Sequence, residues 1–371
     1  MDVNLLWLKA HAVKLNLGNL MNKMTPYLSD KIKVLSLVAI TMVIYIHTYY
    51  TEGNGFPFFL ALQRFLGGVG LSGVANPLFY FTSGYLFFLG VKSVKECFPK
   101  MKKRVRTLFV PYLLANTLAF LLYVVLDVVS RLSPSLYGVV NFHILDWFSL
   151  DVFTLLKNIY WGPVAFQLWF VRDMMLFVLL SPLIYYLLAW ASRMRVSTLL
   201  LLIVLLCCYF FTCKHVLWMA IGGLISMSDV IDITIWKSSK LKDAFIIFCG
   251  LIFIAFAFCN SIGIVDLHYG YALFGVIAVW LLYDKIAKGR IFVPNNKYLA
   301  TACGFTFFIY LIHEPILLIF KKLPLLVSSG ELMLTICFLF MPLVFIIMTI
   351  YMGVLLRKMM PKALSLYMGG R

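Results

Sequence analysis

The stretch KIKVLSLVAITMVIYIHTYY, residues 31–50, decides the class of fold. It contains no charged residue from Val34 to Ile46, and His47 closes the apolar run just before the polar segment TEGNG. A helix that crosses a bilayer core of about 30 Å needs about 20 mostly apolar residues, because each residue rises about 1.5 Å. Similar runs recur along the chain, which is therefore predicted to lie in a membrane.

The composition of the chain supports the same conclusion. Of its 371 residues, 63% are hydrophobic and 13% are charged, more apolar side chains than a soluble domain can bury. Backbone polar groups in lipid must pair within their own segment, which favours helices over open strands. We predict an all-α fold, a polytopic membrane helical bundle of about ten transmembrane helices. The predicted spans are 34–50, 73–91, 108–130, 168–190, 197–213, 215–231, 244–260, 268–284, 302–320 and 331–355.

The formal net charge of +17 is explained by where the basic residues lie. Lys and Arg gather in short loops between apolar runs, as the positive-inside rule requires. This placement predicts that both termini are cytosolic and, without an RNA-binding motif, argues against nucleic acid as a partner. Three parts are expected: a cytosolic amphipathic segment at 1–30, a transmembrane domain at 31–358 and a cytosolic tail at 359–371.

Ionisable side chains within apolar spans are costly, so each is a candidate for a functional site. The sequence places His47 at the end of the first span, Arg172 beside Asp173 in the fourth, and His313 beside Glu314 in the ninth. Neighbours on a helix point about 100° apart, so we expect Arg172 and Asp173 to find partners elsewhere rather than each other. No HExxH pattern or third ligand accompanies the His-Glu pair, so no metal is expected.

Polar side chains also form stripes on two of the predicted helices. Tyr80 and Ser83 share a face of the second span, and Tyr310 shares a face with His313 in the ninth. Such stripes either bond one helix to another or face a ligand.

The segment KSVKECFPKMKKRVR, residues 92–106, carries seven Lys and Arg residues. It either sets the topology by contacting anionic lipid or binds the phosphates of a polyanionic cofactor. The candidate phosphate ligands are Lys102, Lys103, Arg104 and Arg106.

Five fragments in this order resemble the acyltransferase 3 family of integral membrane acyltransferases, over roughly residues 31–355. They are KIKVLSLVAITMVIYIHTYY, PLFYFTSGYLFF, KKRVRTLFVPYLLAN, QLWFVRDMMLFVLLSPLIYYLL and FTFFIYLIHEPI. The first fragment departs from the family pattern. The family usually carries an Asp and an Arg in this helix, the Arg eleven residues before the His, and this chain has Lys33 and Ser36 at those positions.

The resemblance implies transfer of an acyl group, most often acetyl, from acetyl-CoA or another acyl-CoA to a hydroxyl of an envelope glycan or glycolipid. It also implies a multi-pass protein of the bacterial cytoplasmic membrane. His47 would be the general base and the four cations of 102–106 would bind the phosphates of coenzyme A. The further catalytic candidates are His313 and Arg172, and the candidates for substrate binding are Tyr80, Ser83, Asp173 and Tyr310. A transporter or flippase for a glycan or lipid intermediate is the alternative.

Overall fold

The computed structural model describes residues 24–132, 143–212, 214–228, 239–264 and 270–370, so most of the predicted segment 1–30 lies outside it. The described residues form helices, with no strand among them. The longer helices are α2 (Pro26–His47), α4 (Ala75–Phe88), α6 (Val110–Leu132), α9 (Trp169–Ala191), α10 (Arg195–Thr212), α11 (Leu217–Met227), α12 (Lys240–Ser261), α13 (Ala272–Ala287), α15 (Thr306–Phe320) and α16 (Glu331–Met359). Shorter helices are α3 (Pro57–Leu66), α5 (Cys97–Arg104), α8 (Val152–Leu156), α14 (Lys297–Gly304) and α17 (Pro361–Tyr367).

Each of the ten predicted spans overlaps one of the ten longer helices. Among the described residues, six helices are long and apolar enough to cross a membrane, or seven if the bent pair Lys297–Gly304 and Thr306–Leu325 is one span. The protein is therefore a polytopic helical bundle. The count of ten spans and the cytosolic location of both termini stay predictions.

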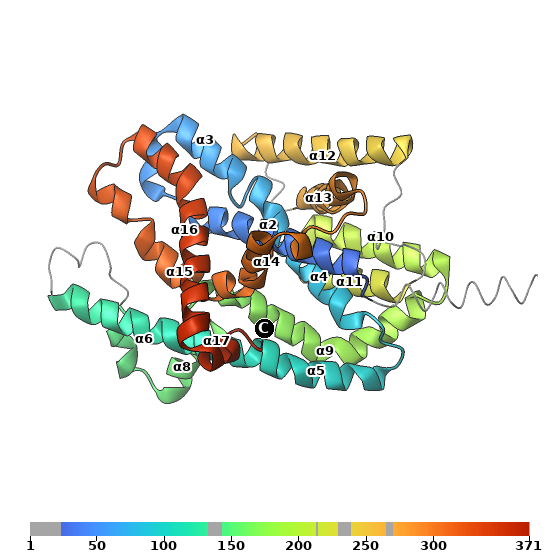
Figure 1. The fold of residues 1–371 in the computed structure, drawn as a ribbon, viewed down its shortest axis with the longest axis horizontal. Helices are drawn as coiled ribbons and strands as arrows, with labels where there is room; N and C mark the ends of the chain where they lie inside the picture. Colours follow the sequence, from blue (N-terminus) through green and yellow to red (C-terminus); the bar gives the residue numbers. More distant parts are fainter. Residues whose placement is uncertain (1–23, 133–142, 213, 229–238, 265–269, 371) are drawn as a thin grey trace, which may run out of the picture.

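Helix α2 lies in the middle of the bundle (Figure 1). It packs against α4, α13, α14, α15 and α16, so its side chains reach most of the interior. The helix begins where the hydroxyl of Thr25 accepts a hydrogen bond from the backbone N–H of Leu28, with Pro26 in the first turn. Both features favour a helix start at this position.

The Lys31 end of α2 is anchored by a buried polar network. The carboxylate of Asp284 accepts hydrogen bonds of 2.6 Å from the hydroxyl of Tyr27 and from the ammonium of Lys31. That ammonium also lies 4.1 Å from the centre of the Trp280 ring. Asp30 accepts three further bonds, from one tyrosine hydroxyl and two backbone N–H groups of the segment that follows α13. The network ties α2 to α13.

Two glycines let α4 and α11 approach closely. A Cβ atom at Gly84 would lie 2.0 Å from the carbonyl oxygen of Met219, and one at Gly222 would lie 2.1 Å from that of Phe81. Small residues allow such contact between helices, because no side chain separates the two backbones. The contact fixes the position of α4, which carries Tyr80.

The chain after α16 folds back onto the start of α6. One turn of π-helix, η4 (Val105–Phe109), joins α5 to α6, and α17 packs against α6. Gly369 has a φ of +70°, and a Cβ atom there would lie 2.7 Å from Cα of Thr107. The end of the described chain therefore lies beside the basic segment 92–106.

Candidate functional site

The His47 end of α2 meets the middle of α15. The Nδ1 atom of His47 pairs with the carboxylate of Glu314, and their side chains are 16% and 18% exposed. A carboxylate oxygen accepts, so in neutral His47 the Nδ1 atom carries the hydrogen and Nε2 keeps a free lone pair. The ammonium of Lys321 holds this end of α2 by donating to the carbonyl oxygens of His47 and Tyr49, at 3.1 and 3.2 Å.

A second histidine, His313, lies beside His47 and directly precedes Glu314 in α15. The ring of His313 is wholly buried, and its centre is 5.0 Å from that of the His47 ring. Its Nδ1 atom is 2.8 Å from the carbonyl oxygen of Tyr310, which can only accept, so Nδ1 carries the hydrogen. Its Nε2 atom is buried and has no hydrogen-bond partner among the described residues. Neutral His313 therefore presents an acceptor, and it cannot donate to an oxyanion.

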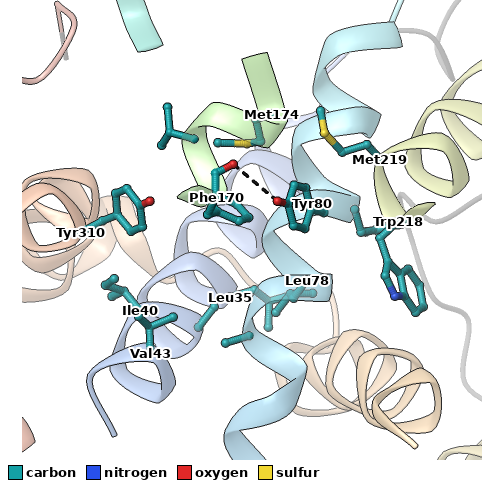
Figure 2. Close-up of a cluster of buried hydrophobic side chains, with 14 of the residues drawn as sticks. Leu35, Ile40, Val43, Leu78, Tyr80, Phe170, Met174, Trp218, Met219 and Tyr310 are labelled. Atoms are coloured by element: carbon teal, nitrogen blue, oxygen red, sulfur yellow. Dashed lines mark hydrogen bonds between the residues drawn. The ribbon is translucent and has the colours of Figure 1, made fainter. Parts of the chain in front are cut away.

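The rings of Tyr80, Phe170 and Tyr310 form an aromatic cluster inside the bundle (Figure 2). The ring of Phe170 lies 4.4 Å from that of Tyr80 and 5.9 Å from that of Tyr310, measured between centres. The Tyr310 ring is in turn 5.8 Å from that of His313. The Tyr310 hydroxyl donates to the backbone carbonyl of Gln167 at 2.6 Å, which holds the ring in place.

A cavity of about 210 Å³ borders this cluster, between α2, α4, α9 and α15. Ser83 and Ser36 line it, and the rings of Phe170 and Tyr310 form one wall. His47 is not among the described residues that line it. The cavity reaches the cluster that packs against His313 and stops there.

The basic segment 92–106 reaches this cavity through Arg104, which lines it. A second cavity of about 400 Å³, lined by Lys103, Arg104 and Gly370, shares Arg104 with the first. Arg106 lies next to Gly370, its Nε atom 4.0 Å from where a Cβ atom would stand there, but it lines neither cavity. Lys102 instead lines an outer groove, to which Arg104 also contributes. Of the four predicted phosphate ligands, Lys103 and Arg104 therefore line the cavity system, and Lys102 and Arg106 do not.

The prediction that Arg172 and Asp173 would not pair with each other is wrong. The guanidinium of Arg172 donates to Asp173 at 2.9 and 3.0 Å and to the carbonyl oxygen of Trp161 at 2.8 Å. The long Arg arm folds back along the helix, so the angle between neighbouring Cβ atoms does not decide its partner. Arg172 lines the same outer groove as Lys102.

The sequence named Glu314 as a candidate but not its partner, and it did not identify two further residues of the site. Glu314 stood in the sequence only as the neighbour of His313, whereas the structure makes it the partner of His47. Gln167 is buried, and its side-chain oxygen has no partner in the described part of the chain. Lys100 donates to the carbonyl oxygens of Phe87 and Leu89 at 2.7 Å and so caps α4. The carboxylate inside an apolar run was the signal that made Glu314 a candidate.

The chain resembles known proteins along most of its length. A family model described as an acyltransferase domain matches residues 30–354. Succinoglycan biosynthesis protein ExoH of Rhizobium meliloti (strain 1021) is 23% identical over 309 residues, with 79% of each chain covered. No solved structure matches. The family match includes the helices that carry His47, Glu314 and Arg104.

Proposed function

Because this chain belongs to the acyltransferase 3 family, we propose that it transfers an acyl group, acetyl in the first instance, from acyl-CoA to a hydroxyl of a cell-envelope glycan. Its family and helices make it a multi-pass membrane acyltransferase. The similarity to a succinoglycan biosynthesis protein of a bacterium supports a polysaccharide acceptor and a bacterial cytoplasmic membrane. The family match favours acyl transfer over the alternative of a transporter or flippase.

The observation that carries the proposal is the pair of His47 and Glu314 beside buried His313. A sugar hydroxyl is a weak nucleophile until a base accepts its proton. Nε2 of His47 is the base. The hydrogen bond from Nδ1 of His47 to Glu314 sets the orientation of the ring, and the carboxylate stabilises the imidazolium that forms. His47 is partly exposed, so an acceptor can reach it. Nε2 of His313 and the free side-chain oxygen of Gln167 supply acceptors for further hydroxyls.

In the proposed reaction the acceptor oxygen attacks the thioester carbonyl carbon as its proton moves to Nε2 of His47. The carbon–sulfur bond then breaks, and the imidazolium of His47 passes this proton to the thiolate of coenzyme A as it leaves. Ser83, which lines the cavity, is a candidate donor to the oxyanion. Tyr80 and Arg172 already donate to Phe170 and to Asp173, so they suit positioning better than the oxyanion role.

The donor would enter through the basic cavity. Lys103, Arg104 and Arg106 offer charge for the phosphates of coenzyme A, and the shared cavity leads from Arg104 toward Tyr310. Rotation of the Phe170 ring would open a passage from this cavity to His47 and His313. We expect no metal in this chemistry.

The experiment is mass spectrometry of envelope glycans from cells that lack this protein and from cells that regain it. Wild-type protein should restore an acyl group on the glycan, and His47→Ala should not restore it at equal expression. His143→Ala, at a histidine that is 62% exposed outside the site, is the matched control. An identical glycan mass in deleted and restored cells would contradict the proposal.

A further inference from the structure

A long groove runs along the outside of the bundle between α9, the α5–η4–α6 segment and α8. Figure 1 shows α9 along α5, with α8 beside α6. The groove has a volume of about 1130 Å³, and its lining is almost wholly apolar, with Phe109 and Leu176 among the exposed side chains. Neither cavity of the proposed donor path includes these two residues, although Arg104 lines the groove and both cavities.

All the charged residues of the described chain that line this groove are cations. They are Lys102, Arg104, Lys157 and Arg172. Lys102 and Arg104 lie at one end, in α5. Arg172 lies at the other end, where its guanidinium donates to Asp173 and to the carbonyl of Trp161 and keeps two N–H groups for a ligand. Lys157 begins the π-helical turn that ends at Trp161. Such a groove suits a ligand with a long apolar part and a negative charge.

The Arg172 end of the groove leads toward the histidines. Phe166 packs edge-on against His47, with 6.3 Å between ring centres, and Arg172 follows it by six residues in one nearly continuous helical segment. Six residues of helix span about 9 Å. A group attached to a phosphate at Arg172 would therefore have only a short distance to cover to reach His47.

We propose that this groove binds a phosphate-bearing lipid with a long apolar chain, the carrier of a lipid-linked glycan. The chain would lie against Phe109 and Leu176, and the phosphate would meet Lys157 and Arg172. This inference rests on the proposed function, because it specifies the acceptor of that reaction as a glycan still attached to its lipid. The attached sugar would extend from the phosphate past Phe166 to the base.

The test is native mass spectrometry of the purified full-length protein in detergent with geranylgeranyl phosphate as the probe. We expect one bound molecule that neither geranylgeraniol, which lacks the phosphate, nor phosphatidylglycerol displaces at equal concentration. Lys157→Glu should weaken binding about tenfold, the loss of one charge-assisted contact plus repulsion. Leu176→Trp should narrow the groove and weaken binding.

Two variants elsewhere on the surface control for charge and bulk. Lys240→Glu at the start of α12 and Leu200→Trp on the exposed face of α10 should bind the probe as the wild type does. Equal binding of geranylgeraniol, or displacement by phosphatidylglycerol, would overturn the inference by reducing the groove to a site for bulk lipid. Unchanged binding in both groove variants would overturn it as well.

The inference and the proposed function fail separately. Probe binding needs no acyl transfer, so His47→Gln protein should retain it. Retained binding in a protein whose cells show no acylated glycan would remove the proposed function and leave the lipid site standing. Glycan acylation that depends on His47, from a protein that does not bind the probe, would remove the lipid site alone.

Discussion

Helix α2 carries one ionic pair near each end, and the two pairs differ in burial and in bonding. At the Lys31 end, Lys31 and Asp284 are 0% and 3% exposed, and the ammonium and both carboxylate oxygens each have a hydrogen-bond partner. At the His47 end, His47 and Glu314 are partly exposed, and Nε2 of the adjacent His313 has no partner in the part of the chain that the structure describes. A saturated buried network holds a structure together, whereas free acceptors beside an opening are available for chemistry.

The largest expected effect is on catalysis, at the His47 end of α2. His47→Gln keeps the size and polarity of the side chain but removes the base. We expect the rate of acyl transfer to fall by about 10²–10⁴, the usual contribution of a general base. The measurement is turnover of radiolabelled acetyl-CoA by the purified protein, with His143→Gln as the control. A loss of less than about tenfold would place the base elsewhere.

At the Lys31 end of α2 the expected effect is on stability. Lys31→Met leaves Asp284 buried without its cation, and breaking such a pair costs about 3–5 kcal/mol. Thermal unfolding in detergent should occur at a markedly lower temperature. Pairing this change with Asp284→Leu should recover part of the loss, because no buried charge then remains. An unaltered unfolding temperature for Lys31→Met would contradict the structural role.

Glu314→Gln tests whether Glu314 acts through His47. The amide can still hold the ring in place but no longer stabilises the imidazolium, so we expect about a 10–100-fold lower rate. Glu314→Asp should recover part of this rate, since it restores the charge. Equal rates for the Asp and Gln variants would show that charge at this position is unimportant.

The smallest expected effect is on the KM for the acyl donor. Arg104→Gln removes one cation from the rim shared by the two cavities, and KM for acetyl-CoA should rise about tenfold with little change in kcat. Lys358→Gln, at the exposed end of α16, is the control. An unchanged KM would leave the basic segment with a role in topology alone.

The sequence predicted the positions of the longer helices well, because uninterrupted apolar runs report directly on residues that avoid water. It also selected His47, His313 and Tyr310, since polar groups in such runs are rare. It did not predict the partners. Glu314 joins His47 across a distance in sequence that only the packing of α2 on α15 closes.

The Lys31 end of α2 likewise shows that the sequence does not reveal which residues pair. Lys31 and Asp284 lie far apart in the chain, and each alone looks like an ordinary charge at the edge of an apolar run. Arg172 and Asp173 show the opposite error, because a flexible side chain paired with the neighbour that helix geometry had seemed to exclude. Pattern and spacing locate helices, but the rotamers of long charged side chains depend on what surrounds them.

The two ends of α2 are compared most directly in one assay of acyl transfer per folded molecule, for His47→Gln and for Lys31→Met. We predict that His47→Gln unfolds at the wild-type temperature yet transfers almost no acyl group, whereas Lys31→Met is unstable but transfers normally in the fraction that stays folded. Normal transfer by folded His47→Gln, or loss of transfer by folded Lys31→Met, would contradict this prediction.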